Sequence, residues 1–302
     1  MDVAVTGSSG LIGSALRPAL EAAGHRVLRL VRPGSRSSAG SDAVAWDPQA
    51  GTIDAGGLEG VGAVVNLAGE GIGDRRWNDA QKARIRDSRV KGTTLLAETL
   101  AGLSDPPGVL VSGSAIGIYG DRGDEILTED SPPGSAFLAE VCQAWEAATA
   151  PAEAAGIRVV HLRTGIVLSA AGGVLKKMIA PFKLGLGGRM GSGRQWMSWI
   201  VIDDEVGAIV HVLGDGGPTG PVNVTAPHPV TNAELTKALG DVFHRPTLMP
   251  LPGAALKLAL GAQMAEELLL GGQRVLPTRL EGSGYTFGAP ELRQALTQLL
   301  AS

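Results

Sequence analysis

The chain has 302 residues, 44% of them hydrophobic and 19% charged, so it is long enough to form one or two domains with full cores. Its net charge of −4 disfavours a general nucleic-acid-binding protein, which normally carries a basic surplus. The single cysteine excludes an intramolecular disulfide, and the five scattered histidines form no metal-ligand motif. We therefore expect neither a metal site nor a nucleic-acid partner.

No targeting or membrane segment is evident in the sequence. The first predicted strand begins at Asp2, which leaves no room for a signal peptide. The most apolar late stretch, residues 251–270, is interrupted by Pro252 and by three charged residues, unlike a membrane span. These features predict a cytoplasmic protein that does not interact with membranes.

The N-terminal half alternates short apolar runs with helical patterns. Residues 62–67 and 109–112 are continuous apolar runs, typical of strands that are buried on both faces. The predicted strands are 2–5, 26–31, 43–46, 62–67, 109–112 and 157–162, and the predicted helices are 11–23, 78–100 and 136–155. This alternation predicts an α/β fold with a doubly wound parallel sheet and right-handed crossovers.

The pattern changes after about residue 165, where we place a domain boundary that the chain crosses more than once. Residues 185–193 are rich in glycine turns, and Thr231 with Glu234 forms a capping-box pattern at a helix start. The remaining predicted elements are helices at 203–213, 253–270 and 290–300 and a strand at 222–224. We expect a smaller C-terminal substrate lobe and helical region over 166–302.

Residues 3–13 (VAVTGSSGLIG) form the strongest local pattern, an apolar strand followed by a glycine turn and the start of a helix. Gly7 permits the tight turn, Gly10 lets the backbone approach a pyrophosphate, and Gly13 lets the helix pack on the strand. An ordinary strand-to-helix turn is the alternative, which three glycines in register disfavour. The predicted cofactor contacts in this turn are Thr6, Gly7, Ser9, Gly10, Leu11, Ile12 and Gly13.

The end of the second predicted strand indicates which dinucleotide would bind. An acidic residue there would bind the ribose hydroxyls of NAD, but Arg32 follows the strand and Arg36 lies close behind. Arginine offers a planar fork that matches a phosphate. We therefore expect NADP(H) rather than NAD on residues 1–165, although both arginines could instead be solvated loop charges.

Three segments resemble those of extended short-chain dehydrogenases/reductases: the glycine turn 6–13, the N-x-A-G strand end 66–69, and 112–120 (SGSAIGIYG). More narrowly, 137–146 (FLAEVCQAWE) and 268–284 are similar to the atypical branch of nucleoside-diphosphate-sugar epimerase-like proteins. The resemblance implies a Rossmann domain with a C-terminal domain. It also implies cofactor contacts from the strand ends at Asn66, Leu67, Ala68, Gly69 and Arg163.

The catalytic pair of that family, Tyr-x-x-x-Lys, is missing. Four residues beyond Tyr119 and Tyr285 stand Gly123 and Ala289. In the family the lysine lowers the tyrosine pKa and holds the cofactor ribose. The expected helix instead carries Phe137, Leu138, Val141 and Cys142.

Three residues remain as catalytic candidates. Ser114 is placed to contact a substrate carbonyl or alcohol, although strand-end serines are also common turn residues. Tyr119 has a proton to donate or serves only as a packed phenol, and Glu70 is a general acid/base, a ribose ligand or an ion-pair partner of a nearby arginine. Glu146 is better interpreted as a member of an ion pair.

The segment after the glycine-rich turns carries the substrate candidates Arg194, Gln195 and Trp199, unless the turns form only a mobile hairpin. Together these features predict an NADP(H)-dependent oxidoreductase or epimerase for a nucleotide-sugar or a small carbonyl or alcohol substrate. The alternative is a regulatory NADP(H)-binding protein without catalysis. The helices that flank such a sheet are compatible with a homodimer.

Overall fold

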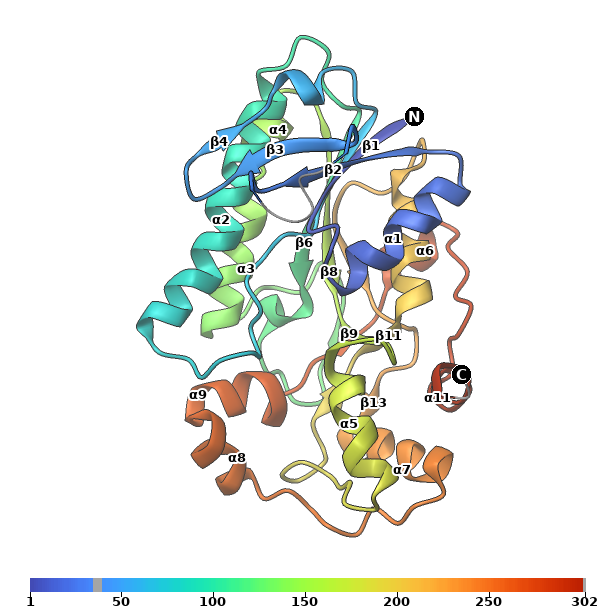
Figure 1. Cartoon of the computed structure of the whole chain (residues 1–302). Helices are drawn as coiled ribbons and strands as arrows, with labels where there is room; N and C mark the ends of the chain where they lie inside the picture. The colour runs from blue at the N-terminus through green and yellow to red at the C-terminus, as the bar shows by residue number, and fades with distance from the viewer. Residues whose placement is uncertain (35–39, 301–302) are drawn as a thin grey trace.

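The computed structural model describes residues 1–34 and 40–300, and its centre is a sheet whose strands follow the order β12-β8-β6-β5-β1-β2-β3-β4 (Figure 1). All neighbouring strands pair in parallel except β3 with β4. The strands are β1 (Asp2–Thr6), β2 (Arg26–Val31), β3 (Ala43–Asp47), β4 (Thr52–Ile53), β5 (Ala63–Asn66), β6 (Val109–Ala115), β8 (Arg158–Thr164) and β12 (Gly220–Val224). This order confirms the predicted Rossmann-type, doubly wound sheet.

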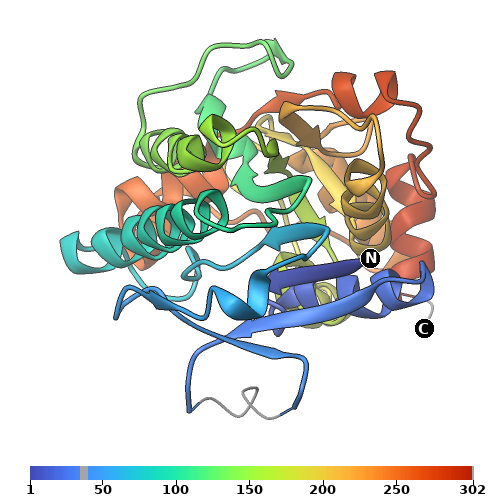
Figure 2. The same ribbon diagram turned by 90° about the horizontal axis from the view of Figure 1, so that it is seen from above.

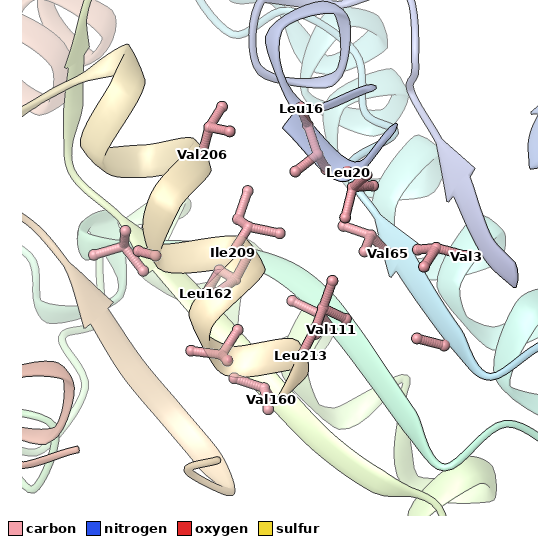
Figure 3. Packing of buried hydrophobic residues seen from close by; sticks show 14 of the residues in the cluster. Val3, Leu16, Leu20, Val65, Val111, Val160, Leu162, Val206, Ile209 and Leu213 are labelled. Atoms are coloured by element: carbon pink, nitrogen blue, oxygen red, sulfur yellow. The ribbon is translucent and has the colours of Figure 1, made fainter. Parts of the chain in front are cut away.

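Helices cover both faces of the sheet (Figures 1 and 2). On one face α1 (Leu11–Ala22) and α6 (Ile202–Leu213) pack side by side, and on the other lie α2 (Asp79–Ala101), α3 (Phe137–Ala147) and α4 (Ala150–Ala154). Figure 3 shows how the apolar side chains of α1 and α6 meet the strands. Its labelled residues are Val3, Leu16, Leu20, Val65, Val111, Val160, Leu162, Val206, Ile209 and Leu213.

The strand register gathers polar residues at one edge of the sheet. Thr6 pairs with Asn66, Asn66 pairs with Ser112, and Ser114 pairs with Arg163. Since the strands are parallel, these side chains all lie at the carboxyl edge. This is the edge at which open α/β sheets bind their ligands.

Most of the smaller lobe follows β8 and lies beyond this edge (Figure 1). Its described part contains three two-stranded sheets, and one of them includes β7, which comes from the N-terminal half of the chain. The pairs are β9 (Ile166–Leu168) with β11 (Trp199–Val201), β10 (Trp196–Met197) with β13 (Val230–Thr231), and β7 (Ile126–Leu127) with β14 (Arg274–Val275). The longer helices of the lobe are α5 (Gly173–Lys183), α7 (Asn232–Phe243), α8 (Gly253–Leu260) and α11 (Leu292–Leu300). The predicted capping box of Thr231 and Glu234 is confirmed at the start of α7.

Two predicted helices are broken, and each break has a local cause. The helix expected over 136–155 divides into α3 and α4, with Pro151 in the first turn of the second helix. The helix expected over 253–270 breaks at Gly261, whose φ of 92° no right-handed helix accepts, and continues as α9 (Ala262–Ala265) and a π-helical turn, η4 (Glu266–Leu270). Among the described residues, no helix is both long and apolar enough to cross a bilayer.

Candidate functional site

The glycine turn between β1 and α1 has the close packing that its sequence predicts. Gly7 has a φ of 65°, and its carbonyl oxygen accepts a hydrogen bond of 2.9 Å from the amide of Gly10. A Cβ at Gly13 would lie 2.3 Å from the carbonyl oxygen of Gly7 and 2.7 Å from the Cα of Ser8. Only glycine at position 13 therefore lets the start of α1 pack directly against the turn.

The start of α1 is open to a ligand. Its N-cap residue is Gly10, and no side chain caps the helix there. The amides of the first turn, which include those of Leu11 and Ile12, precede any intrahelical partner, and the helix dipole places positive charge at this end. Ser9 and Gly10 are exposed. This arrangement fits the pyrophosphate of a dinucleotide.

A buried hydrogen-bond network fixes the strand ends beside this turn. The Thr6 hydroxyl donates to Asn66 Oδ1 over 2.7 Å and accepts from the amides of Leu67 and Ala68. Asn66 Nδ2 in turn donates to Thr93 Oγ1 on α2 over 2.8 Å. Thr6 and Asn66 therefore hold the β1 and β5 ends in register and fix the backbone that follows Asn66.

The end of β2 is basic, as the sequence predicts. Arg32 is exposed directly after the strand, whereas Arg36 lies outside the described residues. The sequence did not predict an acidic residue at this strand end. The pairing of β3 with β2 brings Asp42 there, and its carboxylate accepts two hydrogen bonds from Arg29. These hydrogen bonds hold the pKa of Asp42 below its usual value. Asp42 is therefore paired with Arg29, and Arg32 is an exposed positive charge at this strand end.

Ser114 lies in a buried charged cluster at the ends of β6 and β8. Its hydroxyl donates to Glu146 Oε1 on α3 over 2.7 Å. Arg163 donates to both carboxylate oxygens of Glu146, over 2.8 and 2.9 Å. This bidentate pair confirms the ion pair predicted for Glu146. Burial alone would raise the pKa of Glu146, but the hydrogen bonds and charge of Arg163 outweigh it and lower the pKa.

Tyr119, which the sequence offers as a proton donor or as a packed phenol, is fully buried. Its hydroxyl donates to Asn223 Oδ1 over 2.6 Å and accepts from Arg163 Nη1 over 3.0 Å. Burial raises the pKa of this phenol. The hydroxyl of Tyr119 thus links Arg163 on β8 to Asn223 on β12. The guanidinium of Arg163 donates its hydrogen bonds to groups of the protein and not to a ligand.

Glu70 follows β5 and has a free carboxylate. Among the described residues no group donates a hydrogen bond to this carboxylate, and Arg76 and Arg84 donate instead to Leu258 and Gln81. The charge of Glu70 acts on the nearby guanidinium of Arg89. The backbone of Glu70 is held instead, since its amide donates to Ser88 Oγ and its carbonyl accepts from Arg89. Glu70 therefore presents an available carboxylate at the carboxyl edge.

The three substrate candidates lie in different environments. Arg194 is exposed, and Gln195 is buried with its Nε2 donating to the carbonyls of Met190 and Leu269. Trp199 is 1% exposed and packs in the core of the smaller lobe. Of the three, only Arg194 presents its side chain to a ligand, while the other two hold the lobe together.

The C-terminal segment contributes to the site in a way that sequence reasoning missed. Glu267 lies in η4, and its Oε2 accepts a hydrogen bond of 2.8 Å from the amide of Leu138 at the start of α3. This carboxylate caps α3, the helix on which the resembled family has its Tyr-x-x-x-Lys pair and this chain does not. Only a contact between residues 129 positions apart reveals it.

Glu205, in the first turn of α6, is a fully buried carboxyl group beside the end of β8. Thr164 Oγ1 donates to its Oε1 over 2.9 Å, and Oε2 has no partner within the described chain. Burial raises the pKa of Glu205 to about 8. The folded protein therefore keeps the proton on Glu205 at neutral pH.

We expect the free energy of unfolding to fall as the pH rises from the ordinary glutamate pKa to about 8. In this window the unfolded chain has lost the proton that the folded protein retains, so the slope is up to about −1.4 kcal/mol per pH unit. Glu205→Gln should remove this slope and make the protein more stable than wild type at pH 8. Urea unfolding at pH 5.5, 7 and 8 measures both; equal slopes for the two proteins would contradict the prediction.

Comparisons with known proteins agree with this geometry. The family model described as "NAD dependent epimerase/dehydratase family" matches residues 3–225, and a model of a domain of unknown function, DUF1731, matches residues 251–299. An epimerase family protein of Mycobacterium bovis is 47% identical over 294 residues, which cover 97% of this chain and 96% of the relative.

Two solved structures are similar over nearly all of this chain. The human epimerase family protein SDR39U1, solved with NADPH, is 35% identical with a TM-score of 0.90 and full coverage of both chains. A nucleoside-diphosphate sugar epimerase of Corynebacterium glutamicum is 39% identical with a TM-score of 0.81, over 99% of this chain and 58% of that one.

Proposed function

This chain belongs to the NAD dependent epimerase/dehydratase family, and from that premise we propose that it is an NADP(H)-dependent oxidoreductase or epimerase. The membership confirms the resemblance drawn from the sequence. We propose a nucleotide-sugar or another small carbonyl or alcohol compound as the substrate. The relative solved with NADPH supports the cofactor, and the relative described as a nucleoside-diphosphate sugar epimerase supports the substrate class.

The observation that carries the proposal is the fit of the glycine turn to a dinucleotide. Gly7 and Gly13 let the turn pack closely on the protein's own backbone, which leaves the uncapped start of α1 and the exposed Gly10 for a pyrophosphate. Arg32 offers a cation to the 2′-phosphate of NADP(H). When bound, the nicotinamide supplies hydride exchange. The protein's own part is to hold the dinucleotide and to position the substrate.

We assign substrate contacts to three residues. The Ser114 hydroxyl donates its hydrogen bond to Glu146, so its oxygen can accept a hydrogen bond from a substrate hydroxyl. The free carboxylate of Glu70 exchanges a proton or binds a hydroxyl at the same edge, and Arg194 binds an anionic group from the smaller lobe. Tyr119 receives no such role because its hydroxyl is consumed inside the fold.

We expect calorimetric titration to show that NADPH binds more tightly than NADH. Arg32→Ala should remove this preference, since a lost charged hydrogen bond costs about 1.5–3 kcal/mol, roughly tenfold or more in affinity. Arg293→Ala, which removes an exposed arginine from α11 in the smaller lobe, should leave both affinities unchanged. A wild-type protein that binds neither dinucleotide would contradict the proposed function.

A regulatory NADP(H)-binding protein without catalysis is the second candidate. It is favoured by the absence of Tyr-x-x-x-Lys from the sequence and by the burial of the Tyr119 hydroxyl. The two candidates differ in turnover. If wild type converts a nucleotide-sugar or carbonyl compound with NADPH and Ser114→Ala is slower, the enzyme is supported, whereas equal inactivity of both on a broad panel supports the regulator.

A further inference from the structure

Arg89 is a partly buried cation at the carboxyl edge that the proposed function leaves unused. It lies on α2, and its Nη1 donates to the carbonyl oxygens of Glu70 and Ile85, each over 3.0 Å. A Cβ at Gly69 would lie 3.1 Å from its Cζ and 3.3 Å from Nη1 and Nη2. The glycine of the N-x-A-G strand end therefore leaves the space that the guanidinium occupies.

In the described part of the chain no carboxylate forms a hydrogen bond or close ion pair with this guanidinium, although the charge of nearby Glu70 favours the cation. Its charge faces the ring of Trp145, 5.0 Å away, and two backbone carbonyls. Burial lowers the pKa of Arg89, which means that the site penalises the cation. Its Nε and Nη2 donate to no described residue, so two donors of the planar fork remain for a ligand.

The position of Arg89 relative to α3 indicates which ligand group it meets. Helices α2 and α3 pack side by side on one face of the sheet (Figure 1). The charge of Arg89 acts on the buried thiol of Cys142, whose pKa burial raises to about 12. Cys142 stands on the helix where the resembled family carries its lysine. Arg89 on α2 thus places a cation beside α3, the helix that lacks the family's lysine.

Building on the proposed function, we propose that Arg89 binds the ribose on the nicotinamide side of the dinucleotide. Its free Nε and Nη2 are spaced to donate to the two vicinal hydroxyl oxygens of that ribose. In this role Arg89 takes over the cofactor-holding part of the missing lysine. It does so from a different helix, and no residue is assigned the lysine's other role, which is to lower the pKa of the catalytic tyrosine.

The test compares two ligands on three variants. Arg89→Met should weaken NADPH binding at least about tenfold. It should change the affinity for 2′-phosphoadenosine 5′-diphosphate, which lacks the second ribose, by less than about twofold. Arg89→Lys, which keeps the charge but loses the fork, should weaken NADPH binding to an intermediate degree. Arg86→Met removes an exposed arginine from the same helix and should alter neither affinity.

The outcomes separate this inference from the proposed function. Wild type that binds no NADPH overturns both. Wild type that binds NADPH while Arg89→Met binds it equally well overturns the role of Arg89 alone, and so does an equal loss for both ligands. If Arg89→Met fails to fold, the affinities of Arg89→Lys and Arg89→Gln for NADPH and for 2′-phosphoadenosine 5′-diphosphate test the inference in the same way.

Discussion

Glu146→Ala is expected to lower the free energy of unfolding by about 3–5 kcal/mol, because it leaves the guanidinium of Arg163 buried without its carboxylate. The side chains of the pair are only 14% and 9% exposed, so water does not replace the lost partner. Ser114 would lose its acceptor in the same variant. Urea unfolding at pH 7 measures the change.

An exposed ion pair and a double variant serve as controls. Asp87→Ala breaks the pair with Lys91 on the surface of α2 and should cost less than about 1 kcal/mol. Glu146→Leu combined with Arg163→Met removes both charges and should recover part of the loss. If Glu146→Ala is as mild as Asp87→Ala, the buried pair does not stabilise the fold.

The pair also predicts a loss of stability in acid. Because the folded pKa of Glu146 is lowered, its stabilising contribution is present above the ordinary glutamate pKa and is lost as the pH falls through the folded value. Wild type should therefore lose more stability than Glu146→Ala on acidification. This dependence is opposite in direction to that of Glu205.

Gly13→Ala is expected both to destabilise the protein and to weaken NADPH binding. Its methyl group would meet three backbone atoms of residues 7 and 8 at 2.3–2.9 Å, and backbone cannot yield as a flexible side chain does. Overpacking of this kind costs about 1–3 kcal/mol, and the displaced turn should weaken binding at least about tenfold. Thermal unfolding and NADPH titration measure the two effects.

Two other glycines separate stability from binding. Gly282→Ala adds a methyl group with no atom within 4 Å and should change neither property. At Gly10 the added methyl would meet only the Gly7 carbonyl oxygen, at 3.3 Å, so Gly10→Ala should keep most of the stability but weaken binding at the exposed turn. If Gly13→Ala behaves like Gly282→Ala, the close packing of the turn is not required.

Local sequence was sufficient for the parallel strands of the sheet and for the glycine turn, but it did not indicate the short antiparallel strand β4. The strand, turn and helix start of residues 3–13 are adjacent in the chain, so consecutive residues are enough to predict them. The capping box of Thr231 and Glu234 was predictable for the same reason, because both partners lie within one helical turn. The broken helices were missed because apolar periodicity continues through Gly261 and across the α3–α4 break.

Long-range partners were beyond the reach of the sequence. The sequence leaves Tyr119 open as a proton donor or a packed phenol, and the choice depends on Asn223, 104 residues later, which accepts its hydrogen bond. Asp42 neutralises Arg29 only because β3 pairs with β2. Trp199 looks like a substrate contact until the lobe folds around it.

The sequence by itself determined the Rossmann architecture, the glycine turn and the loss of Tyr-x-x-x-Lys, because each depends on residue types at short, fixed spacing. Only the tertiary structure decided which polar groups remain available at the carboxyl edge. Tyr119 and Arg163 are engaged in buried hydrogen bonds, whereas within residues 1–34 and 40–300 the carboxylate of Glu70 and two donors of Arg89 have no hydrogen-bond partner. The physical reason is that a polar group's availability depends on its desolvation and on its partners, and parallel strands bring those partners together from distant parts of the chain.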